Sequence, residues 1–136
     1  MKRLSFIFLL ILLLFQVSVA QETKKDVIPN DTTIYSMFMV DKPASIPHSV
    51  LNEHVTKTLK YPIDALQKGI QGTVYVLFVV EKDGSISNVK VRKGINPDID
   101  KEAVRVISTM PNWEPGKNKG VIVRTKNEKP VHFKIR

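Results

Sequence analysis

The stretch Gly72-Thr-Val-Tyr-Val-Leu-Phe-Val-Val80 decides the fold of this chain. Val74, Val76, Phe78 and Val80 share one face of an extended segment, and the residues between them are also apolar or aromatic. A strand that is apolar on both faces is typical of the centre of a sheet. The sequence therefore predicts a central strand that is at least partly covered on both sides.

A hairpin follows this strand. Asp83-Gly84 predicts a tight turn, because glycine tolerates the positive φ that such turns require. Residues 85–92 then return antiparallel. Their apolar parity changes between residue 86 and residues 89 and 91, which predicts a β-bulge near Ser87 and Asn88.

Two helices are expected before the strand. Residues 49–59 carry apolar side chains at helical spacing, with Ser49 as the predicted N-cap. A short helix follows, in which Pro62 fits the first helical position and Ala65 and Leu66 are expected to face inward. Gly69 fits the left-handed position after its end.

The main helix is predicted over residues 97–110. It is capped by Asn96 or Asp98 and ended by Pro111. Its expected core stripe consists of Ile99, Ala103, Val106, Ile107 and Met110.

The last extended segment is expected over residues 121–136, with its odd positions on one face. Pro130 cannot donate to a ladder and so belongs at an edge. The simplest arrangement is an α+β fold, a three-stranded antiparallel sheet with helices packed on one face and the last strand at an edge.

The N-terminus has the pattern of a secretory signal. Lys2 and Arg3 precede ten apolar residues, and Ser18-Val-Ala20 offers a cleavage site. An uncleaved membrane anchor is the alternative. The predicted organisation is thus residues 1–20 as signal peptide or anchor, 21–48 as linker or arm, and 49–136 as one domain. Within the arm, residues 34–40 are expected to add a short strand or to pack on the sheet.

The positive charge is concentrated at the C-terminus. Residues 21–116 hold 12 basic and 12 acidic residues, whereas residues 117–136 hold seven basic residues and only one acid, Glu128. A basic tail suggests nucleic acid in a cytosolic protein, but an export signal argues against that partner. An exposed basic strand also resists edge-to-edge aggregation. The sequence leaves this explanation and an acidic partner open.

Residue types and spacing argue against catalysis. His48, His54 and His132 lie far apart with no metal-ligand spacing, and the chain has no cysteine. We therefore expect no enzyme activity, no metal and no cofactor. Trp113 is expected to close the core rather than face a ligand, whereas Tyr61 could either fasten a helix to the sheet or offer its hydroxyl to a partner.

The residues from 49 to 136 resemble the C-terminal domain of TonB-type energy transducers, in the version common in Bacteroidota. The resemblance rests on Leu59-Lys-Tyr-Pro62, Gly69-Ile-Gln-Gly-Thr-Val-Tyr-Val76, Glu81-Lys-Asp-Gly-Ser-Ile86, Met110-Pro111, Trp113, Pro115-Gly-Lys117 and Pro130-Val-His-Phe133. Residues 125–129 depart from the family, which usually has apolar or aromatic residues there.

The resemblance implies a periplasmic domain that binds the TonB box, a short peptide of outer-membrane transporters, by strand addition at its last strand. The positions to which this role falls are Thr58, Tyr61, Pro62, Val131, His132, Phe133, Lys134 and Ile135. Inner-membrane motor proteins are implied as partners if the N-terminus is an anchor. The alternative is an exported, non-catalytic structural module of the cell envelope that uses the same fold to form a homodimer or to bind an envelope polymer.

Overall fold

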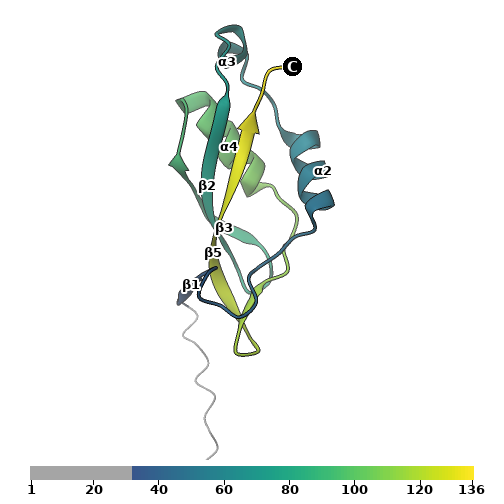
Figure 1. Cartoon of the computed structure of the whole chain (residues 1–136), viewed down its shortest axis with the longest axis vertical. Coiled ribbons are helices and arrows are strands. Elements are labelled where there is room, and N and C mark those ends of the chain that lie inside the picture. The colour runs from purple at the N-terminus through teal and green to yellow at the C-terminus, as the bar shows by residue number, and fades with distance from the viewer. Residues whose placement is uncertain (1–31) are drawn as a thin grey trace, which may run out of the picture. The chain divides into compact units, whose positions relative to one another are not determined.

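The computed structural model describes residues 32–136, and the predicted signal peptide and residues 21–31 lie outside this range. The described residues form one compact unit. Its elements, in chain order, are β1 (Ile34–Ser36), α2 (His48–Thr58), α3 (Ile63–Gln67), β2 (Gly72–Val80), β3 (Ile86–Lys93), α4 (Pro97–Ser108), β4 (Gly116–Asn118) and β5 (Val121–Phe133) (Figure 1).

The sheet is built around β2 and β5. The strand order is β1-β5-β2-β3, and β4 pairs with β5. β2 pairs antiparallel with β5 along its whole length, from Gly72 opposite Phe133 to Val80 opposite Thr125. The predicted α+β class is confirmed, with helices packed on the sheet, although the sheet has more strands than the three expected.

The position of the last strand corrects one prediction. β5 is not a simple edge strand, because β2 lies on one side of it and β1 pairs parallel with it on the other. However, β1 pairs only with the three residues of β5 from Arg124 to Lys126. The short added strand expected within residues 34–40 is confirmed as β1, but the sequence did not predict that it pairs with the last strand.

The hairpin and its bulge are as predicted. Gly84 has φ of +85° in the turn between β2 and β3. The register of these strands shifts between Leu77, opposite Lys90, and Val79, opposite Ser87. Asn88 in the bulge has φ of +50°.

The core lies between the sheet and α4. The predicted stripe is buried throughout, although α4 ends at Ser108 and Met110 therefore lies beyond it. Asn96 is the N-cap, since its side chain accepts a hydrogen bond from the N–H of Ile99. Trp113 is 5% exposed and its ring packs edge-on against Phe78, with 5.3 Å between ring centroids. It therefore closes the core, as predicted.

Three predictions for the first helices are wrong. Pro62 is the N-cap of α3 and not its first helical residue, because the helix begins at Ile63. Ser49 is not the N-cap of α2, because the helix begins at His48 with Pro47 in the N-cap position, and no side chain caps it. Leu66 is 45% exposed, since the five-residue helix α3 turns only Ala65 into the core. Gly69, with φ of +66°, does follow the end of α3 as predicted.

The segment before α2 lies along the sheet. Beyond β1, Lys42 bridges to Lys117 and Ser45 bridges to Glu114. The sequence assigned these residues to a linker or arm, and within the described part of the chain they form an arm attached to the domain. Among residues 32–136, no helix is both long and apolar enough to span a bilayer.

Candidate functional site

β5 leaves part of one edge open. The backbone N–H of Met37 donates to the carbonyl of Lys126, on the side of β5 that faces β1. Backbone groups point to alternate sides along a strand, so the groups of Glu128, Pro130 and His132 point to this same side. No strand within residues 32–136 pairs with β5 there.

Pro130 fits this geometry. It has no N–H, and the regular register of β5 against β2 places its nitrogen on the side away from β2. The open edge therefore presents the carbonyls of Glu128, Pro130 and His132. It presents the N–H groups of Glu128 and His132 only, because Pro130 between them has none.

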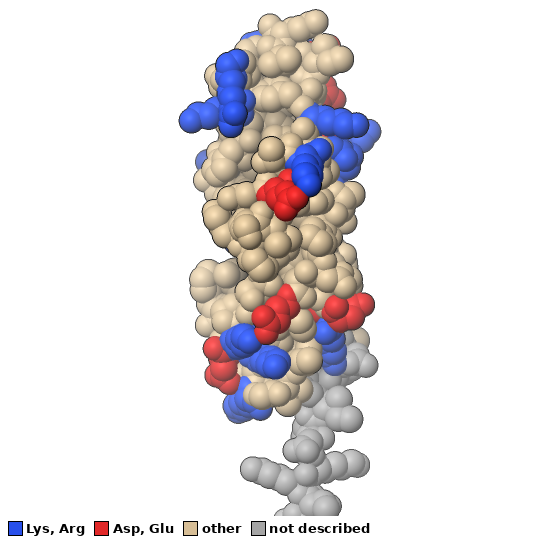
Figure 2. All heavy atoms as spheres, turned by 90° about the vertical axis from the view of Figure 1, so that its right-hand side faces the viewer, with Lys and Arg blue, Asp and Glu red and all other residues tan. Residues whose placement is uncertain are grey.

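A groove runs beside the open edge. Its volume is about 450 Å³, and Figure 1 shows α2 beside β5 on the side away from β2. Its lining consists of His48, Leu51, Asn52, Val55 and Thr56 of α2, Ile107 of α4, and Lys129, Pro130, Val131 and His132 of β5. In the view from the α2 side, the middle of the domain carries few charged side chains (Figure 2).

The predicted peptide-binding residues in and after β5 differ in whether their side chains are buried or exposed. Val131 and Phe133 are 2% and 1% exposed, so their side chains belong to the core. His132 and Lys134 are exposed, and the Nδ1 atom of His132 lies 2.9 Å from the hydroxyl oxygen of Thr73. Ile135 is half-buried, and its N–H donates to the side chain of Gln71.

Tyr61 and Pro62 lie apart from this groove. They line a second cavity of about 540 Å³ between α3 and α4. The Tyr61 hydroxyl donates to the carbonyl of Ile70, and its ring meets Phe133 edge-on with 5.7 Å between centroids. Tyr61 thus fastens the segment before α3 to the sheet. Its contact with β5 is the ring contact with Phe133, whose side chain belongs to the core.

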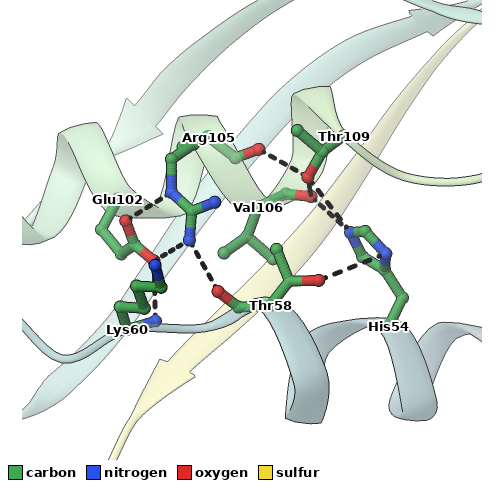
Figure 3. A network of polar contacts seen from close by, with 7 residues as sticks. All are labelled: His54, Thr58, Lys60, Glu102, Arg105, Val106 and Thr109. Atoms are coloured by element: carbon green, nitrogen blue, oxygen red, sulfur yellow. Dashed lines mark hydrogen bonds and ion pairs between the residues drawn. The ribbon is translucent and has the colours of Figure 1, made fainter.

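Thr58 belongs to a polar network that ties α2 to α4 (Figure 3). Its carbonyl accepts from Arg105, at 2.6 Å, and Arg105 also donates two hydrogen bonds to Glu102. Glu102 accepts a further bond from the backbone N–H of Lys60. The hydrogen bonds from Arg105, partly offset by burial, hold the pKa of Glu102 below its ordinary value.

Sequence reasoning missed the helical wall of the groove. His48, Leu51, Asn52, Val55 and Thr56 follow the i, i+3, i+4, i+7, i+8 spacing of one helix face. This spacing was available in the sequence, but it does not show which element the face lies against; in the structure α2 buries none of its side chains fully, and Leu51 packs against the core.

Metal-ligating groups do not converge in the described part of the chain. Residues 32–136 contain no group of three or more His, Cys, Asp or Glu residues that could hold a metal ion. The two histidines of the groove, His48 and His132, therefore have no acidic or cysteine partner set around them.

The fold and the site define a small α+β domain whose sheet leaves part of one strand edge open beside a groove. The sequence matches the family described as Gram-negative bacterial TonB protein C-terminal, over residues 57–135. It is also 33% identical over 98 residues to the protein TonB of Pseudomonas aeruginosa. This chain belongs to the TonB C-terminal family.

The similarity covers 68% of this chain and 29% of the Pseudomonas aeruginosa TonB protein. Among solved structures, the C-terminal domain of that organism's TonB is 31% identical, with a TM-score of 0.45, covering 56% of this chain and 77% of that domain. The C-terminal domain of Helicobacter pylori TonB is 22% identical, also with a TM-score of 0.45, covering 65% and 81%. The Bacteroidota subtype stays a prediction.

Proposed function

We propose that this chain binds the TonB box of outer-membrane transporters by strand addition at the open edge of β5, and so supports energy-dependent transport across the outer membrane. It acts in the periplasm, to which an N-terminal signal exports it, and it is not an enzyme. Inner-membrane motor proteins are further partners if residues 1–20 are an anchor.

The observation that carries this proposal is the open edge at Glu128, Pro130 and His132. An added strand obtains affinity from backbone hydrogen bonds, and side-chain contacts beside it supply selectivity. β2 holds the other side of β5 along residues 125–133, so the edge is part of a rigid sheet. Membership of the TonB C-terminal family supports the choice of partner.

The test is a titration of the full chain with synthetic TonB-box peptides, followed by backbone amide shifts in NMR. We expect the largest shifts at residues 128–134. His132→Pro removes one edge-facing donor and places a ring against the incoming strand, as Pro130 already does two residues earlier. It should weaken binding by about tenfold, which corresponds to about one lost hydrogen bond.

The matched control is His132→Ala, which keeps the backbone donor and should change the affinity by less than about threefold. Thermal unfolding of both variants separates lost binding from lost folding. If the peptides shift only residues around Tyr61 and Pro62, or His132→Pro binds as the unmodified chain does, strand addition at β5 is wrong. Dimerisation in place of peptide binding would support the structural-module alternative.

A further inference from the structure

Large apolar side chains are exposed at one end of the domain. Of the eight exposed large apolar residues in the described part of the chain, five lie in β1, in the turn after it or at the start of β5. They are Ile34, Phe38, Met39, Val121 and Ile122. β1 pairs with β5 directly after the last two, so they share the end of the domain that lies opposite α3 (Figure 1). Single exposed apolar residues are common, but a group of them with polar neighbours marks an interaction surface.

The two most exposed of these side chains belong to one turn, residues 36–39, which we call the apolar turn. The N–H of Met39 donates to the carbonyl of Ser36 at 2.9 Å and closes the turn. Phe38 is 88% exposed and Met39 is 76% exposed. Turns normally carry glycine, proline or small polar residues. Phe38 and Met39 contribute little to the core, and burial of their apolar surface against a partner would be favourable.

Hydrogen bonds hold the apolar turn in place. The N–H of Met37 donates to the carbonyl of Lys126 in β5. Just beyond the turn, the side chain of Asp41 accepts from the N–H of Lys119 at 2.6 Å. The apolar turn therefore projects from a part of the chain that is attached to β5 on one side and to the β4–β5 hairpin on the other.

Positive charge lies beside the apolar turn. Residues 117–126 contain four basic residues and no acidic residue. Arg124 pairs with Glu81, whereas Lys119 and Lys126 form no ion pair with other residues between 32 and 136. Both of these lysines are exposed, and both contact the segment around the turn through their backbones. They complement a surface of negative charge.

An apolar tip flanked by lysines is suited to a lipid surface. Aromatic and other apolar side chains enter the boundary between headgroups and acyl chains, and lysines reach the headgroups. The N-terminal sequence has a signal or anchor pattern over residues 1–20, and only residues 21–33 separate it from β1. Fully extended, this segment spans at most about 45 Å. A chain that keeps its anchor therefore holds the apolar turn close to a bilayer.

From this arrangement we infer that the apolar turn docks the domain on a bilayer that contains anionic phospholipids. Phe38 and Met39 enter the headgroup boundary, and Lys119 and Lys126 lie among the phosphates. Each lysine near such a surface strengthens binding about fivefold, and burial of the phenyl ring adds an apolar contribution. So small an apolar contact gives weak, reversible docking. The inference does not depend on strand addition at β5.

The test follows methionine methyl signals of the full chain by NMR on lipid nanodiscs. The discs contain phosphatidylglycerol and a lipid with a spin label in its upper acyl chain, which broadens methyl groups close to the lipid. Met39 reports on the apolar turn, and Met110, which is 8% exposed, is an internal reference in the core. Because the signal is local, it distinguishes docking of the turn from attachment through residues 1–20.

We expect strong broadening of the Met39 signal and little broadening of the Met110 signal. Phe38→Ser should lower the docking equilibrium constant, measured from the Met39 broadening, about tenfold. The matched control is Ile63→Ser, which removes a 71% exposed side chain from α3 at the other end of the domain and should change this constant less than about twofold (Figure 1). High salt, or discs of phosphatidylcholine alone, should also weaken the broadening.

Three results would overturn the inference. Met39 broadening no greater than that of Met110 would show that the turn does not meet lipid. Equal losses for Phe38→Ser and Ile63→Ser would show non-specific attachment, and equal broadening on neutral discs would show that anionic lipid is not recognised. A Met39 signal that changes with protein concentration in lipid-free solution would show instead that a second copy covers the turn. None of these results bears on peptide binding at β5, whose titration contains no lipid.

Discussion

The Nε2 atom of His54 in α2 lies 2.9 Å from the carbonyl oxygen of Val106 in α4. Because a carbonyl only accepts, Nε2 carries the proton of this hydrogen bond. Val106 is in the last turn of α4, where carbonyls have no partner within the helix. His54 thus shares the Val106 carbonyl with the Thr109 hydroxyl, which donates to it at 3.2 Å, and links α2 to the end of α4.

Replacement of His54 by leucine should remove this hydrogen bond and cost about 1 kcal/mol of the free energy of unfolding. His54→Gln supplies an amide donor at a similar distance from the backbone and should retain most of it. Urea unfolding measures the stability, and hydrogen exchange of the α2 amides measures the local opening. Equal losses for leucine and glutamine would show that packing of the ring, rather than the hydrogen bond, holds α2.

The lowered pKa of Glu102 predicts that the contact between α2 and α4 stabilises the protein in a pH-dependent way. Its side chain is 12% exposed and its pKa is lowered, chiefly by the hydrogen bonds from Arg105. A carboxylate with a lowered pKa in the folded state stabilises the protein fully above its unfolded-state pKa, about 4.3. This stabilisation is lost as the pH falls through the lower pKa of the folded state.

Glu102→Gln should therefore reduce the free energy of unfolding by about 1 kcal/mol at neutral pH, with a smaller difference from the unmodified chain below pH of about 4. The measurement is a series of urea titrations across this range. Since Arg105 is 42% exposed on its side chain, high salt should also reduce the difference. A difference that stays constant from neutral to acidic pH would contradict this account.

Local patterns predicted the elements that carry a repeated signal. β2 was placed correctly because apolar residues occupy both of its faces over nine positions. The bulge at Asn88 was predicted from the change in apolar parity between Ile86 and Val89. The helix α4 was predicted because a cap and a buried stripe point to the same register.

Other features depend on tertiary partners, which local propensity does not specify. β1 and β4 have three residues each, too few to show a period. Thr125 and Asn127 interrupt the apolar face of β5, yet both are buried, because the Asn127 side chain donates to the carbonyl and the hydroxyl of Thr125. The groove was not predicted because it needs the relative placement of α2 and β5.

Gly84 should be intolerant of any side chain. A Cβ atom at this position would lie 2.1 Å from the carbonyl oxygen of Trp113, and φ is +85°. The Trp113 N–H also donates to the Gly84 carbonyl at 2.8 Å, so the two backbones cannot separate without loss of this bond. Gly84→Ala should cost more than about 2 kcal/mol, from the clash and the strained backbone together.

The matched control is Gly69→Ala. Gly69 also has positive φ, +66°, but a Cβ there would meet nothing within 4 Å. Its cost should be about 1 kcal/mol, from the backbone conformation alone. Tryptophan fluorescence follows unfolding in both variants, since Trp113 is the only tryptophan. Similar losses at the two sites would show that the contact with Trp113 relaxes.

Substitutions of Asn88 test whether the bulge determines how β3 pairs with β2. Its φ of +50° lies in the left-handed region, which asparagine and glycine tolerate and β-branched residues do not. Asn88→Gly should leave the free energy of unfolding within about 0.5 kcal/mol, whereas Asn88→Val should lower it by about 1–2 kcal/mol. Chemical denaturation of the three proteins gives these differences. Because β3 lies on the far side of β2 from β5, neither substitution should change peptide affinity at the open edge. A valine variant of undiminished stability would mean that β3 can pair with β2 without the bulge, in a register that turns the residues after it to the opposite face.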